Sequence, residues 1–291
     1  MPVSSTPETK SLTTMQATFR SFEISDPSFE SEGLRHITVK SPALRRRADI
    51  TLWLPESPSG PLPLVILLHG VYGSHWAWAL KGGAHRIAAR LINSGEMPPM
   101  ALAMPSDGLW GDGSCYVRHD SGEDYERWIM DEVPAAAALA CSALTDAPFF
   151  ISGLSMGGYG ALRLAARHGS RILAASAHSA ASSLDDMDTF SDEGMVSLKV
   201  PPGEQSLIEC LSTHCSSLPP FRFDCGLDDV LLPQNRRLHE DLVRKAIPHT
   251  YEELSGDHSW PYWSENLARS LAFFAKNLPN SPTKATQSRP F

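Results

Sequence analysis

The feature that most constrains the fold is a stretch in which an apolar run passes through a glycine-rich turn into a helical pattern. Residues 149–162 read FFISGLSMGGYGAL, with Ser155 at the centre of a G-x-S-x-G motif. A strand that enters this motif and a helix that leaves it place the serine on a sharp, strained turn, where small residues two positions away relieve crowding. A glycine-rich turn with an exposed serine is the alternative. The strand before and the helix after favour a nucleophile elbow.

Short β-branched or aliphatic runs alternate with amphipathic stretches of helical length along most of the chain. The runs typical of buried strands lie at 37–39, 50–54, 64–68, 100–104, 149–152, 172–177, 221–225 and 250–254. The helical patterns lie at 84–93, 123–143, 157–168, 234–246 and 261–277. This alternation predicts a mostly parallel sheet of about eight strands with helices on both faces. The first two strands are joined without room for a helix, so we expect them to be antiparallel.

Both ends of the chain are polar and rich in Pro, Ser and Thr. We expect residues 1–18 and 279–291 to be disordered tails, and residues 19–278 to form a single domain. Between 180 and 219 the alternation stops, and two Pro-Pro pairs interrupt the chain. This segment is expected to be a small cap or an excursion between strands, beside the site.

A serine hydroxyl is a weak nucleophile at neutral pH, so Ser155 needs a base that is itself oriented by a third group. After a nucleophile elbow the acid and then the histidine follow in the chain. His258 comes just after the last predicted strand and before the last predicted helix, which makes it the expected base. Asp228 and Asp229 follow the 221–225 strand, and periodicity does not choose between them as the acid.

The developing oxyanion needs two backbone N–H donors. Met156, directly after the serine, is expected to supply one, and Val71, in the glycine-rich turn after the 64–68 strand, the other. Pockets are lined mainly by apolar and aromatic groups. Residues on loops or at a strand end near the site are therefore candidates for binding substrate: Trp76, Trp78, Trp110, His178 and Trp260.

Composition excludes several classes of protein. The chain has 42% hydrophobic and 20% charged residues and a formal charge of −8, so we expect neither a nucleic-acid partner nor a membrane one. No signal-peptide pattern opens the chain and the five cysteines are not spaced as a disulfide framework, so a cytoplasmic location is expected. Cys210, His214 and Cys215 could suggest zinc, but no second ligand pair follows, and we expect neither a metal nor another cofactor.

Several blocks together resemble the putative esterase family, which includes esterase D, tributyrin-type acyl esterases, S-formylglutathione hydrolases, feruloyl esterases and mycolyltransferases. The blocks are His69-Gly70 followed by Trp76 and Trp78, then 104–108 (MPSDG), 128–134 (WIMDEVP), the elbow at 153–161, 225–229 (CGLDD), and 256–260 (GDHSW) with Trp263. The chain looks most similar to the tributyrin-esterase-like branch. The resemblance implies the α/β-hydrolase fold. It also implies that the acid is the last residue of the Cys-Gly-x-x-Asp block, Asp229.

We therefore expect a serine carboxylic ester hydrolase that acts on small to medium acyl esters through an acyl-enzyme intermediate. A small-molecule ester is the expected partner. Acyl transfer to an alcohol or sugar is an alternative on the same intermediate, and so is hydrolysis of a thioester, as in S-formylglutathione hydrolases. Val71-Tyr72-Gly73 stands where those hydrolases have Leu-Thr-Cys. A non-catalytic binding module is expected to lack a member of the triad, and none is missing here.

Overall fold

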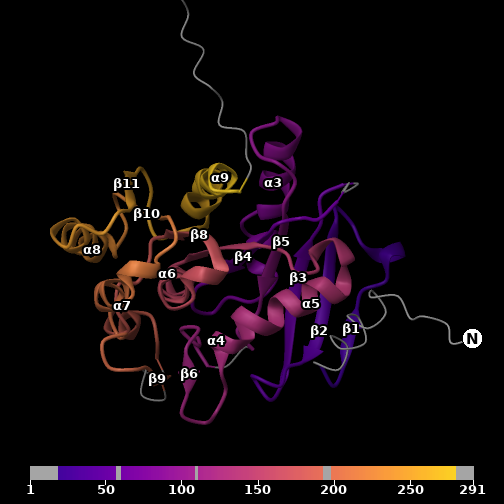
Figure 1. The fold of residues 1–291 in the computed structure, drawn as a ribbon, viewed down its shortest axis with the longest axis horizontal. Coiled ribbons are helices and arrows are strands. Elements are labelled where there is room, and N and C mark those ends of the chain that lie inside the picture. Colours follow the sequence, from indigo (N-terminus) through magenta and orange to yellow (C-terminus); the bar gives the residue numbers. More distant parts are fainter. Residues whose placement is uncertain (1–18, 57–59, 109–110, 193–197, 280–291) are drawn as a thin grey trace, which may run out of the picture.

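The computed structural model describes residues 19–56, 60–108, 111–192 and 198–279. A nine-stranded sheet runs through the middle of the molecule, in the order β1-β2-β3-β5-β4-β7-β8-β10-β11 (Figure 1). Its strands are β1 (Phe22–Ile24), β2 (Leu34–Lys40), β3 (Arg47–Trp53), β4 (Leu64–Leu68), β5 (Ala101–Pro105), β7 (Phe149–Leu154), β8 (Ile172–His178), β10 (Phe221–Gly226) and β11 (Thr250–Leu254).

The sheet is mostly parallel, as predicted. From β5 through β4, β7, β8 and β10 to β11, each strand runs parallel to its neighbour. Three pairs at the other end, β1–β2, β2–β3 and β3–β5, are antiparallel, including the pair expected from its short connection. β4 and β5 read as unbroken apolar runs because helices cover both faces of a parallel sheet. Leu64–Leu68 is accordingly buried at every position.

The sheet has nine strands rather than the eight expected. The additional strand is β1, three residues long, which pairs Phe22 with Val39 at the edge of the sheet. Three residues are too few to show the period-two alternation from which strands are predicted. A separate two-stranded ribbon, β6 (Arg118–His119) with β9 (Leu198–Lys199), is shorter still.

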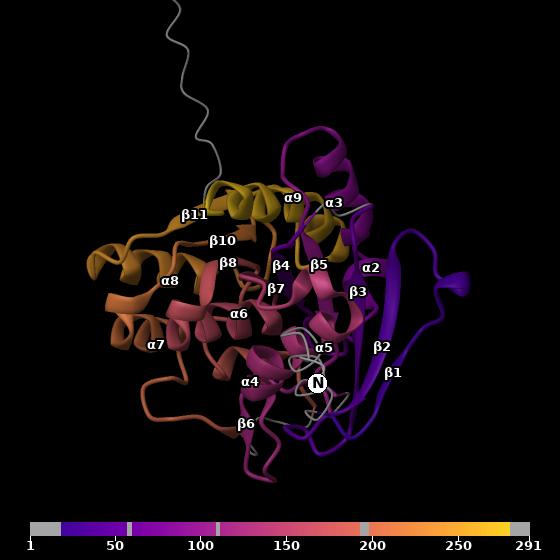
Figure 2. The same cartoon turned by 45° about the vertical axis from the view of Figure 1, so that its right-hand side comes forward.

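Helices cover both faces of the sheet (Figures 1 and 2). One face packs against α2 (Ala77–Leu80), α3 (Ala84–Asn93) and α9 (Trp260–Lys276). The other packs against α5 (Val133–Ala140), α6 (Met156–Arg167), α7 (Leu207–Thr213) and α8 (Leu232–Arg244). The helix expected at 123–143 is three successive pieces: α4 (Tyr125–Arg127), the π-helical turn η2 (Trp128–Glu132) and α5. Pro134, which has no N–H to donate, lies in the first turn of α5.

We propose that residues 19–278 form one domain, because nine of the eleven described strands belong to a single sheet. The predicted tails at 1–18 and 279–291 lie outside the described residues except for Pro279. The segment 180–219 connects β8 to β10 and contains short helical turns, β9 and α7. No helix in the described ranges is long and apolar enough to cross a membrane.

Candidate active site

Ser155 occupies the tight turn between β7 and α6. Its backbone has φ 52° and ψ −118°, a strained conformation for a residue with a side chain. The flanking glycines make the turn possible, because a Cβ on Gly153 would lie 2.1 Å from the Gly157 carbonyl oxygen, and one on Gly157 would lie 2.4 Å from the Leu68 oxygen. The Ser155 amide donates to the carbonyl of His178 at 2.9 Å, which ties the turn to β8. Strand, turn and helix are those predicted for the elbow.

His258 lies between Ser155 and Asp229. It belongs to the loop that joins β11 to α9. Its Nε2 is 3.1 Å from Ser155 Oγ, and its Nδ1 is 3.0 Å from each carboxylate oxygen of Asp229. A hydroxyl, an imidazole and a carboxylate in hydrogen-bonding sequence are the parts that a nucleophile, its base and the base's orienting group require.

The two neighbouring aspartates have different surroundings. Asp229 is 5% exposed and faces the imidazole, whereas the side chain of Asp228 is exposed. The backbone N–H of Asp228 donates to the carbonyl of Gly256 at 2.9 Å, which joins the Asp229 loop to the His258 loop. Only one of two adjacent residues in such a turn faces the imidazole. The contact with His258 is made by Asp229 and not by Asp228.

Ser179, which the sequence did not single out, also contacts Asp229. Burial raises the pKa of the Asp229 carboxyl, but hydrogen bonds from His258, Ser179 and the Leu231 amide outweigh it and hold that pKa below its usual value. The Ser179 hydroxyl in turn accepts a 3.1 Å hydrogen bond from Trp263 Nε1. No motif marks this serine, because its role depends on β8 and β10 ending side by side.

Aromatic rings cover the imidazole of His258 on two sides. Phe190 stacks on one face, with ring centroids 5.2 Å apart and 14° between the planes, and Trp263 meets the ring edge-on at 5.0 Å. Tyr72 donates from its hydroxyl to the Phe190 carbonyl at 2.7 Å. The Asp112 carboxylate accepts from the amide of Asp192 at 2.7 Å and the hydroxyl of Ser191 at 2.9 Å. These hydrogen bonds join the loops that carry Tyr72, Asp112 and Phe190 beside the imidazole. The Phe190 loop belongs to the 180–219 segment.

The turn after β4 lies against Ser155. A Cβ on Gly70 would be 3.3 Å from Ser155 Cβ, so the next residue, Val71, is close to the nucleophile. A Cβ on Gly113 would be 2.4 Å from Met156 Sδ and 3.5 Å from Val71 Cγ1, so this glycine packs against the side chains of both residues that carry the predicted donors. Within the described part of the chain, neither the Val71 nor the Met156 amide donates a hydrogen bond to another residue. The described part of the fold therefore leaves both amides free to donate to a substrate oxygen.

A comparison with protein families places the chain in a known group. The model of the family described as "Putative esterase" matches residues 41–274. The chain belongs to this family. It is an ester-hydrolysing enzyme with the α/β-hydrolase fold, which confirms the class expected from the sequence.

Curated and solved relatives cover nearly the whole chain. An acetyl esterase from Caldicellulosiruptor saccharolyticus is 25% identical over 273 residues, which cover 84% of this chain and 98% of that protein. A ferulic acid esterase structure is 24% identical with a TM-score of 0.73, over 90% of this chain and 100% of that one. An S-formylglutathione hydrolase structure from Staphylococcus aureus is 21% identical with a TM-score of 0.70, over 87% of this chain and 99% of that one.

Two side chains that the sequence predicted to line the substrate site of the esterase lie in its core. Trp78 is 1% exposed and donates from Nε1 to the carbonyl of Leu68 at 2.9 Å. His178 is fully buried, with Nδ1 3.0 Å from Asp224 and Nε2 2.8 Å from Ser270. Asp224 is directly opposite His178 on the neighbouring strand β10, so the two side chains lie on the same face of the sheet and contact each other. Both predictions of substrate contact were wrong, because these side chains have no free surface.

The other predicted aromatic residues of the esterase have different positions. Trp76 is 40% exposed. Trp260 is half-buried and meets Trp263 edge-on at 5.4 Å, so it is one ring removed from His258. Trp110 lies outside the described residues. A substrate role for Trp76 and Trp260 therefore stays a prediction.

The two cysteines considered as zinc ligands differ in their exposure to solvent. Cys210 is buried in α7, whereas Cys215 is exposed. Among the described residues, no group of three or more His, Cys, Asp or Glu side chains is arranged to hold a metal ion.

Proposed function

We propose that the protein is a serine carboxylesterase that cleaves small to medium acyl esters through an acyl-enzyme intermediate on Ser155. The observation that carries the proposal is the pair of hydrogen bonds made by His258, at 3.1 Å to Ser155 Oγ and 3.0 Å to Asp229. In this arrangement His258 is the general base, and Asp229 fixes its tautomer and stabilises the imidazolium.

In the first half-reaction Ser155 Oγ attacks the acyl carbon of the ester while His258 Nε2 takes the hydroxyl proton. The carbon–oxygen double bond opens to a tetrahedral oxyanion. When this intermediate collapses, the bond to the leaving alkoxide breaks, and His258 returns the proton to that oxygen. The products are a free alcohol and an acyl group esterified to Ser155.

In the second half-reaction a water molecule takes the place of the alcohol. His258 removes a proton from the water as its oxygen attacks the acyl carbon. Collapse of the second tetrahedral intermediate breaks the bond to Ser155 Oγ, which receives the proton back from His258. A carboxylic acid leaves and the hydroxyl of Ser155 is restored.

The backbone amides of Val71 and Met156 are the proposed donors to both oxyanions. Support comes from the position of the β4 turn against Ser155 and from the absence of other partners for these amides in the described residues. Fixed donors stabilise developing charge without reorganising during the reaction, and one such donor accounts for about 10²–10³-fold in kcat.

The substrate class is tested with p-nitrophenyl esters from C2 to C8, with S-formylglutathione as the thioester. We expect kcat/KM to be highest for the short acyl chains, by at least about tenfold over C8, because the curated relative is named an acetyl esterase. A thioester preference over every ester would instead favour the S-formylglutathione hydrolase alternative. Adding an acceptor alcohol separates transfer from hydrolysis, because transfer forms a new ester rather than free acid.

Ser179 is proposed as a positioning residue for Asp229. Ser179→Ala is expected to lower kcat about tenfold with little change in KM, because a hydrogen bond to a charged group contributes about 1.5–3 kcal/mol. Steady-state kinetics on p-nitrophenyl acetate give both constants, and thermal unfolding checks the fold. Ser217→Ala, which changes an exposed serine, is the control. Equal kcat in the Ser179 and Ser217 variants would contradict the assigned role.

A further inference from the structure

A cavity of about 550 Å³ opens at the end of α6 remote from Ser155. It lies between the α4–η2 segment, the C-terminal half of α6 and the β6–β9 ribbon. The volume is within the range of small-molecule sites. Because α6 spans 12 residues from Met156 to Arg167, its far end is about 18 Å along the helix axis from Ser155. The cavity is therefore separate from the candidate active site.

Cationic side chains dominate the wall of this cavity, in a protein whose formal charge is −8. The cationic residues are Arg118, Arg127, Arg163, Arg167, Arg171 and Lys199. Three acidic residues, Asp124, Glu126 and Asp131, also line it. The six cations and three carboxylates that line the cavity sum to +3, and Glu204, which pairs with Arg163 and Arg167 behind the wall, lowers this sum to +2. A local excess of this size attracts anions to one place on an otherwise acidic protein.

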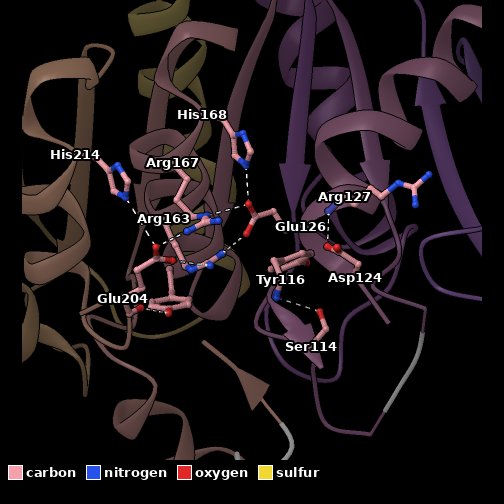
Figure 3. Close-up of polar contacts among 11 residues, drawn as sticks. Ser114, Tyr116, Asp124, Glu126, Arg127, Arg163, Arg167, His168, Glu204 and His214 are labelled. Carbon is pink, nitrogen blue, oxygen red and sulfur yellow. Dashed lines mark hydrogen bonds and ion pairs between the residues drawn. The ribbon is translucent and has the colours of Figure 1, made fainter. Parts of the chain in front are cut away.

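The floor of the cavity is a closed network of ion pairs (Figure 3). Glu126 accepts from Arg163 and Arg167 at 2.9 Å and pairs with His168 at 2.7 Å. Glu204 binds the same two arginines from the other side, at 2.8 Å in the case of Arg163. Burial raises the pKa of Glu126, but His168 and the arginines hold it well below its usual value, so the carboxylate stays ionised. This network fixes the guanidinium groups and occupies the Glu126 and Glu204 carboxylates.

The other two carboxylates on the wall have partners too. Asp131 is 2.9 Å from Arg171, and Asp124 accepts the backbone N–H of Arg127 at 2.9 Å. In Figure 3 the guanidinium of Arg127 extends away from the Glu126 network. The acidic groups of the wall are thus already paired or capping a helix, and they do not balance the remaining cations.

The ribbon carries two of the cations, Arg118 and Lys199, and neither has an acidic partner among the described residues. They are directly opposite each other in the register of β6 and β9, and across the described ranges neither forms an ion pair with a carboxylate. Like charges at opposed positions of a strand pair are destabilising, and a two-stranded ribbon is only marginally stable by itself. An anion between the two side chains would remove the repulsion and hold the ribbon over the cavity.

We propose that this cavity binds a small organic molecule that carries a phosphate group, with the phosphate between Arg118 and Lys199. A phosphate dianion offers several strong acceptor oxygens to a guanidinium and an ammonium at once. Val200, Pro201 and Pro202 give the same cavity an apolar wall against which the organic part packs. A bare inorganic ion would leave that wall uncovered.

The test is calorimetric titration of the full chain with phenyl phosphate, inorganic phosphate and citrate at constant ionic strength. We expect one site that prefers phenyl phosphate, and the same binding in Ser155→Ala, since the cavity is remote from that residue. The double variant Arg118→Gln/Lys199→Gln is expected to bind at least about tenfold more weakly, because each lost contact is a charge-assisted hydrogen bond. Both side chains are exposed, so the fold should persist, and thermal unfolding of the free variant checks this.

A matched control removes the same charge elsewhere. Arg237→Gln/Lys245→Gln changes two exposed cations at α8 and should leave the affinity for phenyl phosphate within about twofold. The proposal is overturned by any of three results. These are no saturable binding of phenyl phosphate below about 10 mM, equal weakening in the two double variants, and citrate binding as tightly as phenyl phosphate.

Discussion

Ser155→Ala is expected to lower kcat for p-nitrophenyl acetate by about 10⁴- to 10⁶-fold, because no other group of the site can take the acyl group. The substitution removes one oxygen atom and keeps the Cβ. The strained turn, the burial of the side chain and the backbone hydrogen bonds are retained. Binding of the ester should change little, so the loss should fall on kcat rather than on KM.

The acyl-enzyme is tested in the same pair of proteins. Intact-mass measurement during turnover of a slow ester should show the native protein heavier by one acyl group, and Ser155→Ala unchanged. Thermal unfolding of both proteins controls for folding, since a buried serine is replaced. Turnover within about tenfold of the native enzyme in the folded variant would refute Ser155 as the nucleophile.

Asp229→Asn is expected to lower kcat by about 10⁴-fold, whereas Asp228→Asn should stay within about threefold of the native enzyme. The Asn amide at 229 presents an N–H to His258 Nδ1 and so favours the tautomer whose Nε2 donates a proton instead of accepting one. Asp228 is exposed and does not face the imidazole, which makes it a control of the same chemistry one residue away. Steady-state kinetics decide between them, and a larger loss at 228 would reverse the assignment.

The same pair of variants carries a prediction for the pH dependence of stability. The folded-state pKa of Asp229 is below its usual value, so ionised Asp229 contributes stability that is fully present above about pH 4 and is lost as the pH falls through the folded pKa. Asp229→Asn removes this contribution. Acid unfolding followed by circular dichroism should therefore be less steep below about pH 4 in Asp229→Asn than in Asp228→Asn.

Most of the sheet was predictable because its strands carry local patterns. The eight runs expected to be strands correspond to β2, β3, β4, β5, β7, β8, β10 and β11. β1 was missed because it is short and becomes a strand only by pairing with β2. The helix at 123–143 was predicted as one element, but a π-helical turn divides it before Pro134.

The candidate site was predictable to a different degree for each residue. Ser155 is marked by a local motif, and the position of His258 follows from chain order in this fold. Trp78 and His178 were assigned to the substrate site because one is on a predicted loop and the other at a strand end near the site. Such a position does not reveal to which side a ring turns, and the structure buries both. The contact of Ser179 with Asp229 has no sequence signal at all.

The sequence by itself determined the strand–turn–helix at Ser155, the mostly parallel sheet and the membership of an esterase family, because each depends on the order of residues within one segment or on a pattern spread along the chain. Periodicity left Asp228 and Asp229 open and the family resemblance favoured Asp229, but only the tertiary structure showed Asp229 facing His258, with Ser179, Phe190 and Trp263 around that pair. It also decided that Arg118 and Lys199 are opposed beside a cationic cavity. These contacts join segments far apart in the chain, and packing between the segments sets the direction of each side chain.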